Sequence, residues 1–463
     1  MKFLNYLWLS FFAGNCFFAG AQSIPPFKKG DRVAFVGNSI THGGRYHQYI
    51  WLYYMTRFPD MPLTILNAGI GGEIAEQMNK RLETDVYTKR PTVIALTFGM
   101  NDTGYFEFLQ SDSTKKTKEK LDRSYRALLQ MDTSFKMHPG IKKILIAGSP
   151  YDETSKFGKN NLFPGKSNAM LRIAAFQESV AKKSGWGFLD LTRPMTAINL
   201  REQAKDSTYT LIGNDRIHPG ADGHLVMAYL FLKAQGLAGK KVADFTVNAA
   251  TLRAERLTNC QITNIQSKQG TLKFDYLANA LPYPVDTMAT GEWGAMQRRE
   301  TDALKLVPFI QDLNQEMLRV NGLAGGRYAV EIDGRKIGEW SRAALKAGIN
   351  LAELSRTPQY EQAMAIKKLN EERWQIERRF RDYAWMEYDF LMDKGLLMKD
   401  DLATLDTIYA HINEGFVRGN LDNYLKARYP EVRDGWQKQM DLLVDEIYRI
   451  NQPKRHTFFI REL

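Results

Sequence analysis

The chain has 463 residues, of which 44% are hydrophobic and 25% charged, and its formal net charge is +11 at pH 7. The length exceeds one ordinary core and predicts two or three domains, and the composition excludes an intrinsically disordered chain. The positive charge is spread out, much of it in helical stretches such as residues 372–383, where Glu and Arg alternate. No basic cluster with interleaved aromatic residues occurs, so we expect no nucleic-acid partner.

The first 21 residues form a distinct segment. Lys2 gives it a positive start, an apolar run follows, and Ala19-Gly20-Ala21 has the small-x-small pattern that precedes signal-peptide cleavage. This arrangement predicts a secretory signal peptide over residues 1–21 and a mature protein in the periplasm or outside the cell. Cys16 raises the alternative of a lipid anchor, but Asn15 directly before it is a poor fit to the small residue expected there.

The rest of the chain predicts neither a membrane span nor a disulfide. No later run reaches ~18 apolar residues, the length that a spanning helix needs. Removal of the signal peptide leaves Cys260 as the only cysteine, so we expect no internal disulfide although the protein is exported. Stability must then come from the burial of apolar side chains.

Residues 31–235 alternate short apolar, β-branched runs with longer runs that have helical spacing. This alternation predicts βαβ units, a parallel sheet and helices on both faces, which is a three-layer α/β/α architecture for a first domain over residues 22–240. Sheets of this kind bind ligands beyond the carboxyl ends of their strands. The predicted strands lie at residues 32–37, 63–69, 92–99, 143–150 and 187–191.

The pattern changes after Gly239 to short β-rich runs and loops rich in Pro and Gly. We predict a small β-sandwich-like module over residues 241–340. Within it, Gly325-Gly326 and Asp333-Gly334 are each predicted to turn a β-hairpin, and Asp-Gly is a strong signal for a two-residue turn. The sequence does not indicate what this module does.

From Ser341 onward the apolar residues recur at helical spacing, most clearly over residues 360–395, and Pro358 suits the first turn of that helix. We therefore predict a helical region over residues 341–463. Its long charged helices carry an apolar stripe that must pack against either the first domain or a second copy of the chain in a homodimer.

Four short segments of the first domain hold residues suited to chemistry. Each lies where a predicted strand ends or in a late loop. They are Gly37-Asn38-Ser39, Asn67 to Gly72, Gly99 to Asp102, and Asp215 to Pro219. Taken singly, each is an ordinary turn or capping segment. Together they supply a serine, a glycine-rich turn, an asparagine and an Asp-x-x-His pair, the residue types that acyl transfer requires.

The chemistry assigns a role to each of these residues. The Ser39 hydroxyl is a weak nucleophile until a base takes its proton, and the neutral imidazole of His218 is suited to do so. The carboxylate of Asp215, three residues earlier, can hold the other ring nitrogen in the right tautomer. The oxyanion that forms needs N–H donors, for which the candidates are the Ser39 N–H, a glycine N–H from residues 71–72 and the Asn101 amide.

The four segments resemble the blocks of the SGNH family, also called GDSL-type esterases, which is named for Ser, Gly, Asn and His in this chain order. The resemblance covers residues 31–235 and not the C-terminal half. Asn38 stands where many members have Asp, which leaves the nucleophile in place. In the second block Gly72 is the matching glycine by its spacing after Asn67, with Gly71 as the alternative.

The resemblance implies a flavodoxin-like α/β/α sandwich, in agreement with the alternating pattern. It implies ester hydrolysis through an acyl-serine, often of acetyl groups on sugars, with no metal and no cofactor. The implied catalytic residues are Ser39, Asp215 and His218, and the implied oxyanion hole consists of Ser39, Gly72 and Asn101. We therefore expect an exported serine esterase whose partner is a small ester or an acylated glycan. The alternatives are a lysophospholipase or arylesterase and, from a different class, a non-catalytic sugar-binding protein on this fold.

Substrate-binding residues are not assigned by the sequence. The polar loop over residues 150–168 contains Tyr151, Phe157 and Phe163, and Trp293 lies in a Gly-rich loop of the second module. Each of these aromatic residues either stacks on a sugar ring or is plain surface.

Two histidines have no assigned role. His42, just after the nucleophile, either lines the mouth of the site or lies on the surface, and His224 is expected to cap or pack at the closing helix. No His-x-His or His-Glu-x-x-His arrangement occurs, so we expect no metal site.

Overall fold

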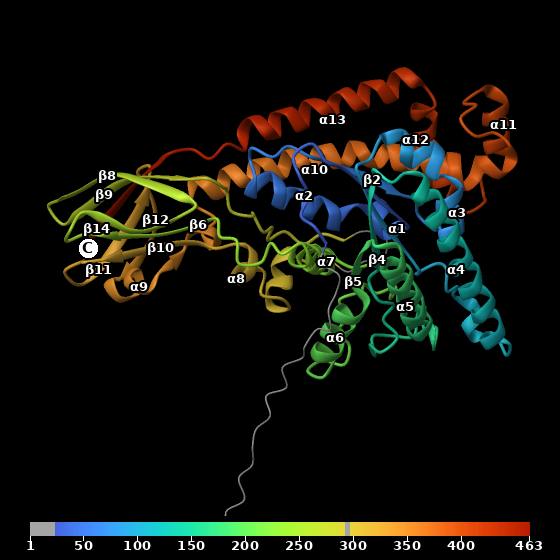
Figure 1. The fold of residues 1–463 in the computed structure, drawn as a ribbon, viewed down its shortest axis with the longest axis horizontal. Helices are drawn as coiled ribbons and strands as arrows, with labels where there is room; N and C mark the ends of the chain where they lie inside the picture. Colours follow the sequence, from blue (N-terminus) through green and yellow to red (C-terminus); the bar gives the residue numbers. More distant parts are fainter. Residues whose placement is uncertain (1–23, 292–296) are drawn as a thin grey trace, which may run out of the picture.

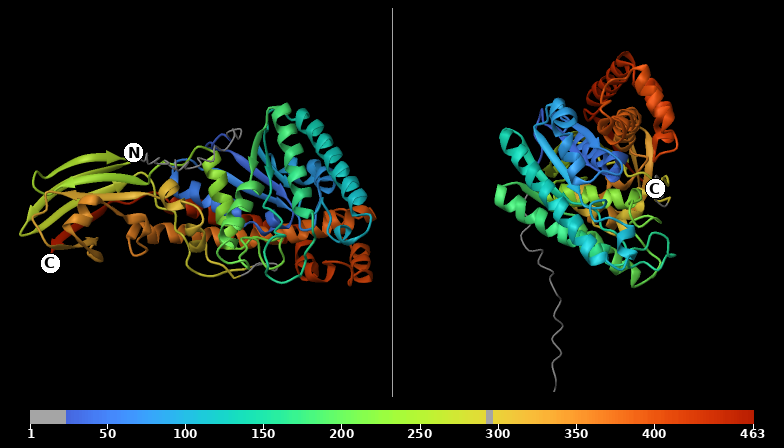
Figure 2. Two further views of the ribbon diagram at one scale, coloured as in Figure 1. Left: turned by 90° about the horizontal axis from the view of Figure 1, so that it is seen from below. Right: turned by 90° about the vertical axis from the view of Figure 1, so that its right-hand side faces the viewer.

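The computed structural model describes residues 24–291 and 297–463. The predicted signal peptide and Trp293 lie outside the described residues. The α/β domain lies toward one end of the long axis and the β module at the other, and the long helices α10 (Pro358–Trp385) and α13 (Pro430–Ile450) run side by side along this axis (Figures 1 and 2).

Five parallel strands form the sheet of the α/β domain, in the order β2-β1-β3-β4-β5. They are β1 (Arg32–Gly37), β2 (Thr64–Gly69), β3 (Val93–Phe98), β4 (Lys142–Ala147) and β5 (Gly187–Asp190). The central strand β3 is buried along its whole length, as expected where helices cover both faces of a parallel sheet. Strand β2 lies at an edge of the sheet and leads into the turn that contains Gly71 and Gly72.

Helices cover both faces of this sheet, which confirms the predicted three-layer sandwich. The helical elements are α1 (Ser39–Gly43), α2 (Arg45–Arg57), α3 (Ala75–Lys80), η1 (Leu82–Val86), η2 (Tyr87–Lys89), η3 (Phe106–Leu109), α4 (Ser113–Met137), α5 (Lys166–Ser184), α6 (Thr192–Gln203) and α7 (Ala221–Ala234). Apolar side chains of α2, α6 and α7 form one core with Phe35 on the sheet. Those of α3, α4 and α5 form a second core with Leu96 on the opposite face.

Two sheets that share one apolar core form the β module. Their strand orders are β13-β10-β6-β7 and β12-β11-β14-β9-β8. Side chains along the strands alternate between this core and the surface. In β9, for example, Leu272, Phe274 and Tyr276 are buried and the residues between them are partly exposed. The strands are β6 (Ala243–Asn248), β7 (Arg253–Thr258), β8 (Cys260–Lys268), β9 (Thr271–Ala278), β10 (Glu316–Asn321), β11 (Arg327–Ile332), β12 (Arg335–Ser341), β13 (Ile349–Asn350) and β14 (His456–Glu462). Between β9 and β10 the chain forms η4 (Glu300–Lys305) and α8 (Phe309–Leu313), whose apolar side chains join the core of the α/β domain.

One of the two predicted hairpins forms. Asp333 and Gly334, with φ of 50° and 78°, join β11 to β12 in the predicted two-residue turn. The hairpin predicted at Gly325-Gly326 is wrong, because the strands on either side of it, β10 and β11, belong to different sheets. Strand β10 pairs in parallel with β6 instead. A glycine-rich bend thus indicates where one strand ends and the next begins, but not which strand the chain then pairs with.

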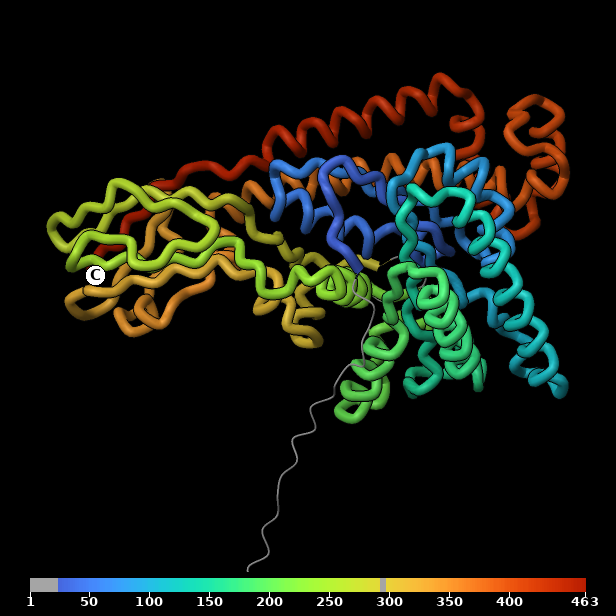
Figure 3. Tube along the Cα trace, viewed as in Figure 1, coloured from blue at the N-terminus to red at the C-terminus, as the bar shows by residue number. Residues whose placement is uncertain are grey.

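The region predicted to be helical, residues 341–463, contains helices as far as Ile450 and then ends in a strand. Its helical elements are α9 (Arg342–Ala347), η5 (Leu351–Glu353), α10, η6 (Met386–Leu391), η7 (Met392–Lys394), α11 (Leu402–Ala410), α12 (Val417–Ala427) and α13. Pro358 opens α10, as predicted. After α13 the chain returns to the β module, where β14 lies between β9 and β11 (Figure 3). The helices are therefore an insertion into the β module.

No helix within residues 24–291 and 297–463 is long and apolar enough to cross a membrane. In the same part of the chain Cys260 is a buried free thiol.

Candidate active site

Ser39 opens α1 directly after β1, at the carboxyl edge of the sheet. Asn38 caps this short helix, because its side-chain oxygen accepts a hydrogen bond from the Ile40 N–H at 3.1 Å. The strand-to-helix turn therefore presents the Ser39 side chain at the edge where parallel sheets bind ligands.

His218 connects Ser39 to Asp215. Its Nε2 lies 2.8 Å from Ser39 Oγ, and its Nδ1 lies 2.5 Å from Asp215 Oδ2. The other carboxylate oxygen of Asp215 accepts hydrogen bonds from the backbone N–H groups of Ile217 at 2.9 Å and His218 at 3.0 Å. Burial would raise the pKa of Asp215, but its hydrogen bonds with His218 outweigh burial and lower this pKa from its ordinary value. An ionised Asp215 holds a proton on Nδ1, which makes Nε2 the acceptor for the Ser39 hydroxyl.

Arg216 fixes the turn that carries Asp215 and His218. Its φ is +65°, in the left-handed region that non-glycine residues rarely adopt. Its guanidinium donates hydrogen bonds to the carbonyl oxygens of Ser155, at 3.1 Å, and Gly158, at 2.7 Å. A buried arginine thus ties the turn to the 150–168 loop and offsets the cost of the strained backbone.

The Asn101 amide is held at both ends. Its Nδ2 donates to the Glu73 carbonyl oxygen at 3.0 Å, and its Oδ1 accepts from the Tyr105 hydroxyl at 2.6 Å. The amide nitrogen carries two hydrogens, so one of them remains for a ligand. The neighbouring Asp102 is buried and accepts from the Gly99 N–H at 2.9 Å, which fixes the turn that carries Asn101.

Lys166, at the start of α5, holds the same turn from inside. Its Nζ donates to the carbonyl oxygens of Met100 and Gly104, each at 2.6 Å, and lies 3.9 Å from the ring centre of Tyr105. Burial lowers the pKa of Lys166 to about 7, although the nearby carboxylates of Asp102 and Glu107 favour the charged form. Sequence analysis did not identify Lys166, since nothing in its local pattern sets it apart.

The two candidate glycines of the second block differ in what their N–H groups do. The Gly71 N–H donates to His42 Nδ1 at 3.2 Å. The Gly72 N–H has no acceptor in the part of the chain that the structure describes, and its φ of +88° favours glycine. A Cβ placed on Gly71 would lie 3.9 Å from Ser39 Cβ, so this turn lies beside Ser39. Of the two, Gly72 is the glycine whose N–H remains for a ligand.

The two unassigned histidines are both buried. His42 is only 3% exposed, so the surface alternative is wrong. Its Nε2 lies 3.0 Å from Asp382 Oδ1 on α10, a residue that sequence analysis missed because 340 positions separate the pair. His224 packs in α7, as predicted, with its ring stacked on Tyr46 at a centroid distance of 6.2 Å.

The aromatic residues of the 150–168 loop are mostly in the core. Tyr151 and Phe163 are 2% and 4% exposed, so neither is plain surface and neither presents a face to a sugar. Phe157 is partly exposed.

A small cavity adjoins the Ser39–His218 pair. Its lining includes Ser39, Arg45, His218, Pro219 and His224. Its solvent-accessible volume is about 20 Å³, which is room for one or two water molecules, since one needs ~10–15 Å³.

Comparisons with known proteins identify the class. Residues 35–226 match the model of the GDSL-like lipase/acylhydrolase family, and residues 364–452 match the diltiazem deacetylase C-terminal helical domain. A solved structure of BT4096, a gut microbial diltiazem-metabolizing enzyme, is similar to this chain with a TM-score of 0.93 and 46% identity, over 96% of this chain and 100% of that chain. The fold and these matches define a carboxylic ester hydrolase.

The chain belongs to the GDSL-like lipase/acylhydrolase family, as its four segments predicted. It is also similar to an acetylxylan esterase of Geobacillus stearothermophilus, with 24% identity over 223 residues, which are 45% of this chain and 94% of that relative. The uncharacterized lipoprotein YqeF of Bacillus subtilis (strain 168) is 31% identical over 173 residues, 36% of this chain and 66% of that relative. The similarity to BT4096 also includes the C-terminal half, which the sequence motifs did not assign.

Proposed function

We propose that the protein is an exported serine esterase that removes acetyl groups from acylated carbohydrates, with Ser39 as nucleophile, His218 as base and Asp215 as the residue that orients the base. The hydrogen-bonded series from Ser39 through His218 to Asp215, at 2.8 and 2.5 Å, is the observation that carries the proposal. Export rests on the predicted signal peptide over residues 1–21.

The reaction has two halves. Ser39 Oγ attacks the acyl carbonyl carbon while His218 Nε2 takes the hydroxyl proton, and the carbonyl oxygen becomes an oxyanion. The Ser39 and Gly72 N–H groups and the Asn101 amide stabilise this oxyanion. The alcohol leaves with the proton from His218 and an acyl-serine remains. Water, deprotonated by His218, then attacks the acyl-serine, and the carboxylic acid leaves as Ser39 regains its proton.

The relatives favour a small acyl group over a long chain, because an acetylxylan esterase and a diltiazem deacetylase domain are both named for the removal of acetyl groups. A lysophospholipase would instead cleave a long acyl chain.

The alcohol half of the substrate has two candidates. The acetylxylan esterase similarity and the predicted export favour an acetylated polysaccharide. The match to BT4096 over nearly the whole chain favours an acetylated aromatic molecule such as diltiazem as a second candidate.

A substrate screen tests both halves of the proposal. Acetate release is measured from acetylated xylan, other acetylated glycans and diltiazem, with Ser39→Ala as the blank. We expect release by the native protein only, and rates on p-nitrophenyl esters that fall from acetyl to octanoyl. Full activity of Ser39→Ala would overturn the mechanism, and rates that rise with chain length would favour the lipase alternative. Failure of a fluorophosphonate probe to label Ser39 would revive the non-catalytic alternative.

A further inference from the structure

Helix α10 covers the exposed edge of β2, the strand that leads into the Gly71–Gly72 turn. An edge strand presents backbone groups that lack a strand partner, and proteins cover such edges. Here the partners are side chains of α10 rather than another strand. Arg373, Glu377 and Arg381 are spaced by four residues, so they share one face of this helix, and all three are buried.

Two of these side chains bind the backbone of the β2 edge. Glu377 Oε1 accepts a hydrogen bond from the Asn67 N–H at 3.0 Å, and Arg381 Nε donates to the Gly69 carbonyl oxygen at 3.0 Å. Arg381 also pairs with the buried Asp85, at 2.9 Å. The helix therefore fixes alternate residues of the segment that ends at Gly71 and Gly72.

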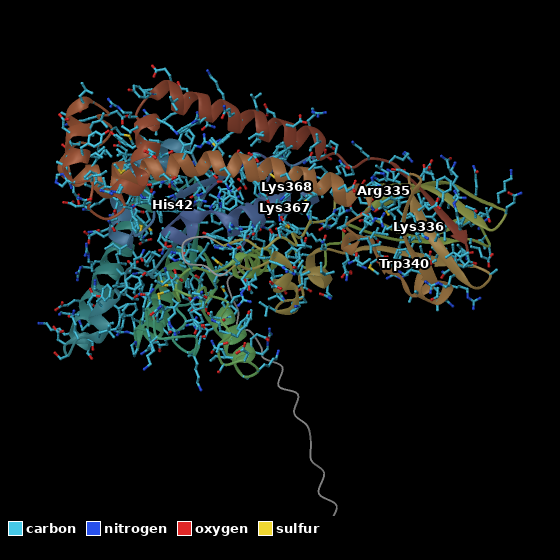
Figure 4. All side chains as sticks on the ribbon, turned by 180° about the vertical axis from the view of Figure 1, so that it is seen from behind. His42, Arg335, Lys336, Trp340, Lys367 and Lys368 are labelled. Carbon is cyan, nitrogen blue, oxygen red and sulfur yellow. The ribbon has the colours of Figure 1, made fainter. Side chains whose placement is uncertain are left out.

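A third contact connects α10 to the Gly71–Gly72 turn indirectly, through the side chain of His42. The Gly71 N–H donates to His42 Nδ1 at 3.2 Å, so this nitrogen carries no proton. The proton of the neutral ring is then on Nε2, which donates to Asp382 Oδ1 at 3.0 Å. In Figure 4 the labelled His42 lies beside the ribbon of α10. Burial lowers the pKa of His42 and outweighs the opposing effect of Asp382, in agreement with a neutral ring.

We propose that α10 is part of the catalytic unit, and that Asp382, acting through His42, is a positioning residue that orients the Gly71–Gly72 peptide of the oxyanion hole. The inference rests on the proposed function, since it needs the Gly72 N–H as an oxyanion donor. The Gly71 N–H is occupied by its hydrogen bond to His42. The next N–H along the chain, that of Gly72, is therefore the one that remains for the oxyanion. The helical insertion thus completes the site rather than only covering the domain.

The contacts from Asp382 through His42 to Gly71 are expected to stabilise the transition state rather than the bound ester. An oxyanion donor acts only if it lies where the charge develops, and a misplacement of ~1 Å costs about 100-fold in rate. The ground-state ester makes less use of the donor, so its binding changes little. Loss of the Asp382 contact is therefore expected to lower kcat and leave KM nearly unchanged.

Two Asp382 variants test the proposal. Asp382→Ala removes the acceptor for His42 Nε2–H, and we expect kcat on p-nitrophenyl acetate to fall about 10–100-fold with KM within about twofold. Asp382→Asn keeps an oxygen acceptor and is expected to stay within about threefold of the native kcat. Glu372→Ala is the matched control, because it removes an exposed carboxylate from the same helix. The affinity of a boronic acid that forms a tetrahedral adduct with Ser39 is expected to weaken in parallel with kcat.

A second pair guards against an Asp382→Ala protein that does not fold. His42→Asn keeps an amide oxygen near the position of Nδ1 for the Gly71 N–H, whereas His42→Phe removes the acceptor, so kcat is expected to be higher for His42→Asn. Native kcat in folded Asp382→Ala or His42→Phe, with Ser39→Ala inactive, would overturn the positioning role and leave the proposed function standing. Activity of Ser39→Ala would overturn the proposed function itself.

Discussion

Replacement of Asn101 by Ala tests the oxyanion hole most directly. The amide uses one of its N–H groups on the Glu73 carbonyl oxygen at 3.0 Å, and its oxygen accepts from the Tyr105 hydroxyl at 2.6 Å. The side chain is therefore preorganised, and its remaining N–H is the one assigned to the oxyanion. Asn101→Ala deletes this donor and leaves the Ser39–His218–Asp215 series in place.

The size of the effect follows from what is removed. Loss of one preorganised oxyanion donor costs ~3–4 kcal/mol of transition-state stabilisation, or about 100- to 1000-fold in kcat. Tyr105→Phe keeps the amide and the ring that packs on Lys166 but deletes the hydroxyl that orients Asn101. A net hydrogen bond is worth ~0.5–1.5 kcal/mol, so this variant is expected to lose only about 2- to 10-fold.

The assay is the initial rate of p-nitrophenyl acetate hydrolysis over a range of concentrations, which separates kcat from KM. Thermal unfolding of each variant shows whether the folded fraction at the assay temperature is unchanged, and Ser39→Ala gives the background. A kcat for Asn101→Ala within a few fold of the native value would refute the assignment of Asn101. A loss in Tyr105→Phe equal to that in Asn101→Ala would refute the argument that the hydroxyl acts only by orienting the amide.

Three further predictions follow from the same geometry. Asp215→Asn should fold normally but lose about 10⁴-fold in kcat, since the neutral amide cannot stabilise the imidazolium; a kcat within tenfold of native would contradict this role. Arg81→Met should lower the free energy of unfolding by about 3–5 kcal/mol in urea, because it removes the ion-pair partner of the buried Glu73 carboxylate, whereas Asp85 keeps its pair with Arg381; an unchanged midpoint would contradict it. Burial lowers the pKa of His47 from 6.5 to about 4, so the unfolded chain binds a proton at higher pH than the folded one. His47 therefore contributes fully to the free energy of unfolding above pH 6.5, and this contribution decreases by about 3 kcal/mol at most as the pH drops toward 4. In urea unfolding at pH 7 and 4.5, the free energy of unfolding of His47→Gln should change less between the two pH values than that of the native protein.

The parts of this protein that the sequence predicted are those with local signals. The five strands of the α/β domain were placed to within a few residues, because each is an apolar run bounded by turn residues. The spacing of four segments placed Ser39 and His218 within hydrogen-bond distance, since parallel strands deliver their carboxyl ends to one edge. Spacing also favoured Gly72 over Gly71, and the contact of the Gly71 N–H with His42 supplies a physical reason.

The parts that the sequence did not predict depend on pairs that lie far apart in the chain. Nothing in the sequence distinguishes Asp382 from the other charged residues of its helix. Only the packing of α10 against β2 brings Asp382 to His42. The last strand, β14, follows a long helical stretch and lies far along the chain from the strands it joins. The bend at Gly325-Gly326 separates two strands in the predicted place, but the choice of sheet depends on apolar contacts that no turn signal encodes.

The placement of β14 constrains the order in which the chain can fold. Strands β9 and β11 each face β14 in the finished sheet, so both keep an open edge until the ribosome has made residues 456–462. Open edges invite pairing with other chains, and closing a contact across so long a stretch of chain is slow. The β module therefore matures last, after the whole helical insertion has been synthesised. Truncation of only the final eight residues should leave its five-stranded sheet split into two hairpins.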